Sequence, residues 1–473
     1  MENTLADSPE IQFIGEEELE QIQQDVLEFL PQIEEWLATE QHAALEELIS
    51  ELHPNDLAAI LYALDFDQAS LFFNRIPFSE RGETLYEMPE KLAYRFLHSG
   101  MTPADIAQSC KGLASDMIAD LLGLLHVREI GDILVHLSFK ERSLILELLS
   151  YPEDTAGALM DKGFIGVQEH QTIHKAISSL RKYGREIDDV HTIYVIDKMG
   201  RYRGNVSLSR MILSRPQTKI KRIMETEIRP IPVDMDQEQV ADFFTRYNLI
   251  TAPVVDEQGI MLGRITVDDI LEVVREEASE DILRMGGMSG EETLDTPVWK
   301  SSLQRIAWLA VNLLTAFLSA AVVKSFEDTI ARIVILAALM PIVAGMGGNA
   351  GSQTLALVVR NLALGELNQA NAWKTFGREF IIGILNGLGI GVLTGLVVFA
   401  FTDSSTLAAI VCLALIANML IAAIAGSTLP ILLQKIGVDP AIASGILVTT
   451  CTDTLGFFVF LGLAWLAIPW LAA

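Results

Sequence analysis

The 473-residue sequence has few cysteines, few aromatic residues and little basic charge. Its three cysteines, Cys110, Cys412 and Cys451, lie far apart and provide neither a disulfide framework nor the ligand spacing of a zinc site. No Ser/His/Asp set, phosphate-binding loop or metal–histidine cluster is evident, so we do not expect an enzyme. Residues 1–30 lack the basic start and apolar core of a secretory signal peptide, which predicts that the large N-terminal region stays in the cytoplasm.

The shortage of basic residues is confined to the first 297 residues. This part holds 26 basic and 55 acidic residues, a net charge of −29, whereas the remaining part holds eight basic and seven acidic residues. A region this acidic is not expected to bind nucleic acid or anionic lipid. Because regular apolar periodicity runs through it, we interpret it as a folded region that takes up cations.

The N-terminal part has the pattern of a small helical stack. After an acidic tail predicted over residues 1–20, helix starts with Pro, Asp or Ser followed by apolar residues recur, as at Leu52–Leu61 and Leu137–Glu141. Short capped helices in succession predict an all-α superhelical domain over residues 21–153. Asp116 and Asp120 share one helical face there, a spacing that an ordinary solvated surface also produces.

Residues 154–275 contain an internal repeat. The segment Asp197–Gly204 matches Asp256–Gly263 at an offset of 59 residues, with a D-x-x-G turn in each copy. A helix, two strands around that turn and a closing helix are predicted for each copy. This looks like a tandem pair of cystathionine-β-synthase-type (CBS) domains, an α+β fold whose pairs often bind adenosine nucleotides. The first copy has Ser207–Arg210 where the second has Thr266–Asp269, which weakens the case for ATP.

An acidic helix closes the repeat. Seven carboxylates lie within 14 residues there, and one arginine offsets them. Spacings of three and four residues place Asp269, Glu272 or Glu276 and Glu280 on one face, where like charges repel. A solvated face explains such a pattern, but carboxylates without cations also suit Mg²⁺ or Ca²⁺. A linker helix is predicted over residues 276–302, leading into the apolar part.

Five apolar segments follow. Most reach the ~20 residues that span a bilayer, so residues 303–473 are predicted to form a five-helix transmembrane domain. With the N-terminal domains in the cytoplasm, an odd number of spans places the C-terminus outside, and the positive-inside rule agrees. We expect the cell (inner) membrane. The segments lie at about residues 303–323, 330–359, 379–401, 405–432 and 440–471.

Two polar features interrupt the spans. Residues 340–353 read M-P-I-V-A-G-M-G-G-N-A-G-S-Q, whose glycines permit close helix packing and whose Asn349 must face protein or water. Asp453 is the one ionisable side chain in the last span, and a carboxylate at that depth is by default a functional-site hypothesis. Thr449 and Gly445 precede it by one and two turns on the same face. We interpret Asp453 as a cation station.

Together these motifs resemble the MgtE family of bacterial magnesium channels over nearly the whole chain. The resemblance rests on Pro341–Gln353, on Asp439–Ala441 leading to Asp453–Gly456, and on Arg305, Trp308 and Asn312. It implies a homodimer in the lipid bilayer that imports Mg²⁺ through a pore on the two-fold axis, lined by the second and fifth spans. The implied pore residues are Asp453, which would hold a hydrated ion, with Thr449, Gly445, Asn349 and Asp439.

The same resemblance implies regulatory Mg²⁺ sites in the acidic region. Bound Mg²⁺ is expected to bridge the acidic domains, draw the linker helices over the pore and close it. Two residues depart from the family pattern: Gly445 replaces an Asn, and Asn248 replaces an expected Asp. The implied sensor residues are Asp116, Asp120, Asp236, Glu238, Asp269, Glu272, Glu277, Glu280 and Asp281.

Other functions stay open. One is a CBS-regulated transporter of another divalent cation, such as Co²⁺ or Mn²⁺. Another is a divalent-ion sensor that does not conduct, which would tolerate Asp453→Asn. A CBS-gated transporter of an anion or osmolyte would need basic or aromatic groups along the membrane path, and the sequence offers none there.

Overall fold

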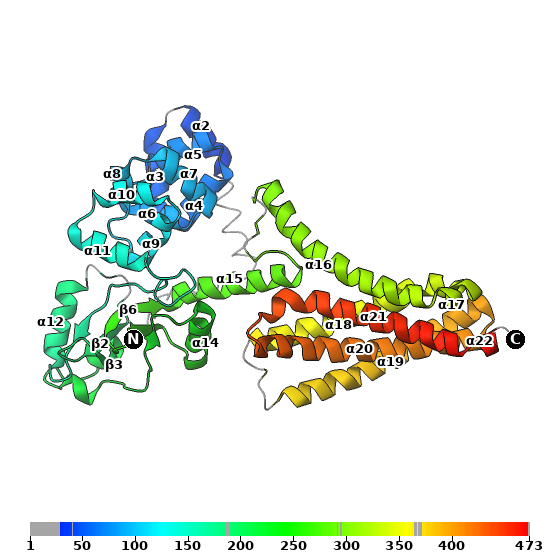
Figure 1. Ribbon diagram of the computed structural model, residues 1–473. Coiled ribbons are helices and arrows are strands. Elements are labelled where there is room, and N and C mark those ends of the chain that lie inside the picture. Colours follow the sequence, from blue (N-terminus) through cyan, green and yellow to red (C-terminus); the bar gives the residue numbers. More distant parts are fainter. Residues whose placement is uncertain are drawn as a thin grey trace, which may run out of the picture. The chain divides into compact units, whose positions relative to one another are not determined.

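The structure is a computed structural model that describes residues 29–471, except 40, 185–186, 188–189, 291, 294–295, 364–366 and 368–370. The chain forms two compact units, residues 1–271 and 272–473 (Figure 1), and each is described by itself. The acidic tail predicted for residues 1–20 lies outside the described residues.

The first unit begins with short helices whose starts are capped as the sequence predicts. The Ser138 hydroxyl accepts the Glu141 N–H, and the Glu141 carboxylate accepts the Ser138 N–H at 2.8 Å, a reciprocal capping box. The predicted all-α architecture is confirmed. The helices are α2 (Leu30–Ala38), α3 (His42–Glu51), α4 (Pro54–Ala63), α5 (Phe66–Phe73), α6 (Phe78–Tyr86), α7 (Glu90–Arg95), η1 (Phe96–Gly100), α8 (Pro103–Ser109), α9 (Ser115–Gly123), α10 (Val127–Leu134) and α11 (Phe139–Leu148).

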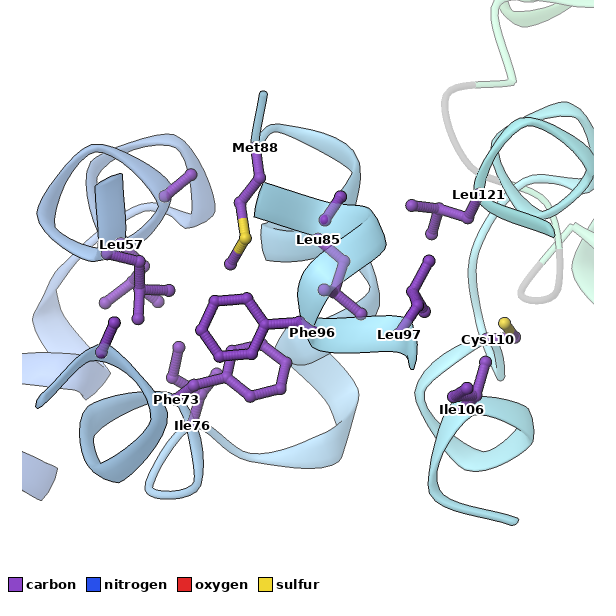
Figure 2. Close-up of a cluster of buried hydrophobic side chains, with 14 of the residues drawn as sticks. Leu57, Phe73, Ile76, Leu85, Met88, Phe96, Leu97, Ile106, Cys110 and Leu121 are labelled. Atoms are coloured by element: carbon purple, nitrogen blue, oxygen red, sulfur yellow. The ribbon is translucent and has the colours of Figure 1, made fainter. Parts of the chain in front are cut away.

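One apolar cluster holds these helices together (Figure 2). Phe73 and Phe96 are fully buried at its centre, with ring centroids 4.6 Å apart. Leu121 on α9 belongs to the same cluster, so the helix that carries Asp116 is anchored to the core. Truncating such a buried ring costs about 3–5 kcal/mol, which makes this core a firm support for α9.

Two copies of one small α+β fold follow, as the 59-residue repeat predicts. Each has a three-stranded sheet in which the first pair is parallel and the second antiparallel. The first copy has β1 (Gly166–Val167), α12 (Ile173–Tyr183), β2 (Thr192–Ile196), β3 (Tyr202–Ser207), α13 (Leu208–Ile212) and η2 (Ile220–Arg222); the second has β4 (Ile231–Pro232), α14 (Gln237–Tyr247), β5 (Thr251–Val255) and β6 (Met261–Thr266).

The D-x-x-G turns are the same in both copies. Asp197 accepts two backbone N–H groups of its own turn at 2.8 and 3.0 Å, and Asp256 does so at 2.8 and 2.9 Å. Gly200 and Gly259 have φ values of 82° and 76°, a region that favours glycine. The CBS-type interpretation of the repeat is therefore confirmed in its local geometry.

A long helix, α15 (Val267–Met285), runs from the first unit into the second. The prediction of one linker helix over residues 276–302 is wrong, because the helix ends at Met285 and the next begins at Val298. Gly287 has φ +74° directly after the first helix, and Pro297 precedes the second. The predicted linker segment therefore contains the end of α15 and the start of α16, with a break between them.

Among the described residues, five helices are long and apolar enough to cross a membrane, as predicted. The second begins five residues later than expected, because Glu327–Arg332 forms a separate helix, α17. In the second unit α18, α20 and α21 lie side by side, α19 packs on α20, and α16 packs on α21 (Figure 1). The five are α16 (Val298–Ser325), α18 (Ile335–Ala363), α19 (Ala372–Thr402), α20 (Ser405–Lys435) and α21 (Pro440–Leu466), and α22 (Ile468–Leu471) ends the described chain.

Glycines bring some of these helices into close contact. A Cβ on Gly351 of α18 would lie 2.5 Å from Val448 Cγ1 of α21, and one on Gly347 would overlap the Asn418 amide of α20. The close packing predicted for the glycine-rich segment therefore holds at these two positions. A Cβ on Gly345 or Gly348 would have nothing of the described chain within 4 Å, so these two glycines lie on a face of α18 that the described chain does not cover.

Candidate ion pathway and cation sites

The face of α21 that carries Asp453 is open in the single chain. Asp453 is half-buried, and its carboxylate makes no hydrogen bond or ion pair with any described residue. Thr449 is exposed and donates its hydroxyl to the Gly445 carbonyl at 3.0 Å. A helix–helix hydrogen bond within the chain therefore does not explain Asp453, and the three residues form one polar stripe.

A second polar stripe lies on α18. Gly345, Asn349 and Ser352 are all exposed and recur at spacings of four and three residues, on one face of the helix. Polar groups at bilayer depth need protein or water as partners. Two helices of the same chain thus each present a polar face that the chain itself does not cover.

The end of α15 lies against the beginning of α21. The Met285 carbonyl oxygen is 3.5 Å from the position of a Cβ on Gly445. The Met285 side chain packs on an apolar cluster that includes Leu355 of α18 and Val448 of α21. The linker helix therefore ends on the same end of both polar-faced helices, next to the first residue of the α21 stripe.

An ion pair fixes this contact. Arg284 Nη1 donates to Asp439 Oδ2 at 2.6 Å, and the same guanidinium pairs with Glu280 one turn earlier. The other Asp439 oxygen accepts the Ala441 N–H at 2.7 Å and caps α21. Asp439, predicted at the mouth of a pore, is therefore in contact with the linker helix.

Asp281 and Asp439 form the first pair of predicted residues that the fold brings together. Burial raises the pKa of Asp281, and the nearby Asp439 and Glu277 carboxylates raise it further, while Arg284 lowers it. Asp281 and Asp439 thus bring carboxylate oxygens from two helices to one place, and oxygen is the ligand that a divalent cation such as Mg²⁺ prefers.

Asp116 and Asp269 form the second pair, in the first unit. Burial raises the pKa of Asp116 well above its usual range, and the charges of Asp269 and Asp161 add to this effect. Burial also raises the pKa of Asp269 to about 6, although its carboxylate accepts the Thr266 N–H and hydroxyl at 3.1 and 2.7 Å. The Asp116 Oδ1 atom is buried with no hydrogen-bond partner among the described residues. This oxygen is free to bind a cation.

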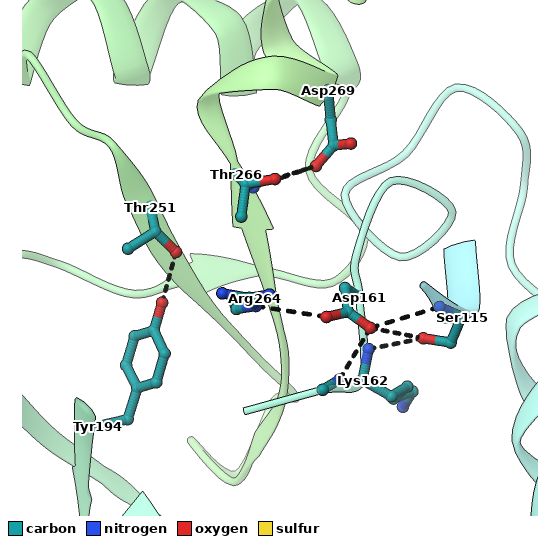
Figure 3. Close-up of polar contacts among 9 residues, drawn as sticks. Ser115, Asp161, Lys162, Tyr194, Thr251, Arg264, Thr266 and Asp269 are labelled. Carbon is teal, nitrogen blue, oxygen red and sulfur yellow. Dashed lines mark hydrogen bonds and ion pairs between the residues drawn. The ribbon is translucent and has the colours of Figure 1, made fainter. Parts of the chain in front are cut away.

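Asp161, which no sequence pattern marks as a site residue, joins the helical domain to the second CBS copy (Figure 3). It accepts the Ser115 hydroxyl at 2.9 Å, the Gly163 N–H at 2.8 Å and the Arg264 Nε–H at 3.3 Å. Asp161 and Arg264 are 8% and 6% exposed, so the ion pair is buried. Since Ser115 precedes Asp116, this network holds the Asp116 carboxylate beside Asp269.

The other predicted sensor residues have plainer surroundings. Asp236 and Glu238 are exposed, and Asp236 caps α14 by accepting the Glu238 N–H at 3.0 Å. Asp120 and Glu272 are exposed, and Glu277 and Glu280 are half-buried near the end of α15. Within the described part of the chain, no group of three or more His, Cys, Asp or Glu side chains could hold a metal.

The departure from the family pattern at Asn248 and the difference between the two CBS copies at Arg210 each have a local structural setting. Asn248 ends α14 in the left-handed region with φ 49°, which Asn tolerates better than most residues. In the first CBS copy Arg210 occupies the position of Asp269, and it pairs with Glu225. The two copies are therefore not equivalent as cation sites.

Two acidic residues of the second unit were missed by the sequence analysis. Glu292, in the loop after α15, is 8% exposed and accepts Arg305 Nε–H through both oxygens at 3.0 and 3.3 Å. Glu379 is 3% exposed inside α19. The apolar run begins at Glu379, which predicts that this residue lies at the edge of a span. The helix itself begins seven residues earlier, at Ala372.

Comparison with known families supports this domain order. Residues 340–463 match the family of divalent cation transporters designated MgtE. Residues 52–154 match the MgtE intracellular N domain, and residues 220–276 match the CBS domain.

Relatives cover most of the chain. The magnesium transporter MgtE of Bacillus subtilis (strain 168) is 30% identical over 418 residues, which are 88% of this chain and 92% of that protein. The magnesium transporter MgtE of Thermus thermophilus is 30% identical over 431 residues, 89% of this chain and 94% of that protein. A crystal structure of the cytosolic domain of the Mg²⁺ channel MgtE with ATP matches 51% of this chain and 98% of its own, with 30% identity and a TM-score of 0.49.

Proposed function

The chain belongs to the MgtE family of magnesium transporters, and we propose that it imports Mg²⁺ through a pore that cytoplasmic Mg²⁺ closes. The observation that carries this proposal is the end of α15, seated beside Gly445 and held there by Arg284 and Asp439. An element that lies at the mouth of a polar-faced helix pair, and that is fixed by charges, is suited to act as a gate.

The pore is assigned to a homodimer. The exposed polar stripes of α18 and α21 become lined by protein and water if two copies meet along them, which removes the cost of facing lipid. Asp453 of each subunit would then face the axis, with Thr449 and Asn349 along the path. Because Mg²⁺ gives up water reluctantly, two carboxylates would hold it through its hydration shell.

The proposed orientation places the acidic region in the cytoplasm and the C-terminus outside. Six of the eight basic residues of the membrane part lie at the helix ends that this orientation places inside, as the positive-inside rule requires. They are Lys300 and Arg305 on α16, Arg360 on α18, Lys374 and Arg378 on α19, and Lys435 on α20.

Closure follows from the two carboxylate pairs. Without Mg²⁺, Asp281 repels Asp439 at the end of α15, and Asp116 repels Asp269 in the first unit. A divalent cation at either pair converts repulsion into attraction and favours the arrangement in which the linker helix lies on the pore helices.

The affinities required are modest. Shifting a two-state gate from 1:99 to 99:1 takes about 5.5 kcal/mol of differential binding. Two pairs in each of two subunits would share this, so each site needs about 1.4 kcal/mol, a tenfold preference for the closed state. Weak, water-rich sites are therefore sufficient for the proposed gate.

Uptake of Mg²⁺ into proteoliposomes tests the proposal. Wild type should take up Mg²⁺, and uptake should fall as internal Mg²⁺ rises. Asp453→Asn should abolish uptake, whereas Asp403→Asn, at the left-handed end of α19, should leave it unchanged because Asn tolerates that backbone. If Asp453→Asn takes up Mg²⁺ as fast as wild type, the pore assignment is refuted and the sensor interpretation remains. Repeating the assay with Co²⁺ and Mn²⁺ would establish selectivity.

ATP at the CBS pair stays a prediction. The Arg210–Glu225 pair of the first copy makes the two copies unlike, so at most one of the two equivalent positions retains the Thr266–Asp269 pattern. Equilibrium dialysis with radiolabelled ATP, on wild type and Asp269→Asn, would test this prediction directly.

A further inference from the structure

A buried carboxylate in the membrane helices has no role in the pore described above. Glu379 is 3% exposed and lies seven residues inside α19. Its carboxylate accepts the Thr354 hydroxyl of α18 at 3.2 Å and Arg378 Nη1 at 2.7 Å. A carboxylate within a membrane-spanning helix is by default a candidate functional site.

Glu379 borders a cavity between α18, α19 and α20. The cavity has a volume of about 190 Å³, and its polar wall is formed by Gln353, Thr354, Arg378 and Asn386 together with Glu379. At about 30 Å³ for each water, the cavity has room for about six water molecules. Polar cavities of this size hold water, so the carboxylate is hydrated within the membrane domain.

The side chains around the cavity favour a cation. Apart from Arg378, every polar group in the wall supplies an oxygen: a carboxylate, a hydroxyl and two amides. The Arg378 side chain is 62% exposed, so its guanidinium lies at the rim and can turn to solvent without being desolvated. A cation that enters can therefore take over the charge compensation that Arg378 provides.

We propose that this cavity is a second cation site, in which Glu379 binds a hydrated divalent cation through water and Arg378 competes with that cation. Six waters and one ion are the first shell of hydrated Mg²⁺, which retains several waters in protein sites. The site is separate from Asp453, because α21 contributes no residue to the cavity wall. The proposal rests on the proposed function only in that Mg²⁺ is the ion supplied to the membrane domain.

Cysteine protection in the full-length protein tests this proposal. Cys110, Cys412 and Cys451 are replaced by Ala, and Asn386→Cys places a single thiol in the cavity wall. The rate of reaction with a cationic methanethiosulfonate is measured with and without Mg²⁺. We expect Mg²⁺ to slow the reaction severalfold, and Glu379→Gln to remove this protection. Gln434→Cys, at the exposed end of α20, should show no protection.

Further variants distinguish the site from the gate. Arg378→Met should shift protection to about tenfold lower Mg²⁺, because the competing cation is gone. Asp453→Asn should abolish uptake and leave protection intact, which separates failure of this site from failure of the pore. If Glu379→Gln keeps full protection, or if it also abolishes closure by internal Mg²⁺, protection reports gate closure and the proposal is overturned. Gln353→Cys replaces Asn386→Cys if the latter does not fold.

Discussion

Replacing Asp161 should destabilise the first unit more than a typical surface substitution, because it removes the carboxylate of a buried ion pair with Arg264. Asp161 compensates Arg264, which is 6% exposed, and also accepts hydrogen bonds from Ser115 and Gly163 (Figure 3). Removing one partner of a buried ion pair typically costs about 3–5 kcal/mol. Asp161→Ala is expected to fall in this range.

The double variant separates the charge from the hydrogen bonds. Asp161→Ala with Arg264→Met removes both charges, and a buried pair replaced by apolar side chains is often neutral or stabilising. The lost hydrogen bonds to Ser115 and Gly163 still cost about 1 kcal/mol each. The double variant should therefore be about 1–3 kcal/mol more stable than Asp161→Ala alone.

Urea unfolding of the full-length protein, followed by hydrogen exchange of the β5 and β6 amides, measures this difference. The matched control is the exposed pair Glu169–Lys221, with side chains 46% and 67% exposed, where single and double variants should differ by less than about 1 kcal/mol. A double variant as unstable as Asp161→Ala would refute the reasoning. The stability would then reside in the hydrogen bonds to Ser115 rather than in the ion pair.

Three further predictions concern pH, packing and gating. Without divalent cations, the free energy of unfolding of the first unit, measured in urea titrations, should fall as pH rises from about 4 to above 6. The reason is that the raised pKa values of Asp116 and Asp269 let the folded state bind more protons than the unfolded state. Saturating Mg²⁺ should reverse this trend. Gly347→Ala should lower the free energy of unfolding in detergent by about 1–3 kcal/mol, because its Cβ would lie 2.7 Å from Asn418 Cγ. Adding Asn418→Ala should relieve most of this loss. Gly389→Ala is the control, because nothing of the described chain lies within 4 Å of its Cβ. Arg284→Gln should raise Mg²⁺ uptake at low internal Mg²⁺, because the pair with Asp439 no longer holds the linker helix, whereas Arg284→Lys should retain most of the wild-type response.

Periodic features could be predicted from the sequence, because they depend on neighbours a few residues apart. The capping box at Ser138, the D-x-x-G turns and the five apolar helices are all local patterns, and the structure contains them. The glycines and the proline that follow Met285 indicate a break near Gly287, but the linker helix predicted over residues 276–302 extends across it.

Features that depend on distant contacts could not be predicted. Asp161 and Arg264 are 103 residues apart, and each alone reads as an ordinary surface residue next to a turn or strand. Glu379 was placed at the edge of a span, although the helix begins at Ala372 and carries it two turns inward. The family resemblance lists Asp116 and Asp269 among the sensor residues without pairing them, because nothing in either local sequence points to the other.

In the proposed gating, the two carboxylate pairs share one arrangement. In each, an acidic residue of α15 faces an acidic residue from another part of the chain: Asp269 faces Asp116, and Asp281 faces Asp439. Both pairs include a residue of α15, which is helical from Val267 to Met285. Under this proposal, each ion would lower the cost of binding the other through the position of that helix, without direct contact between the sites.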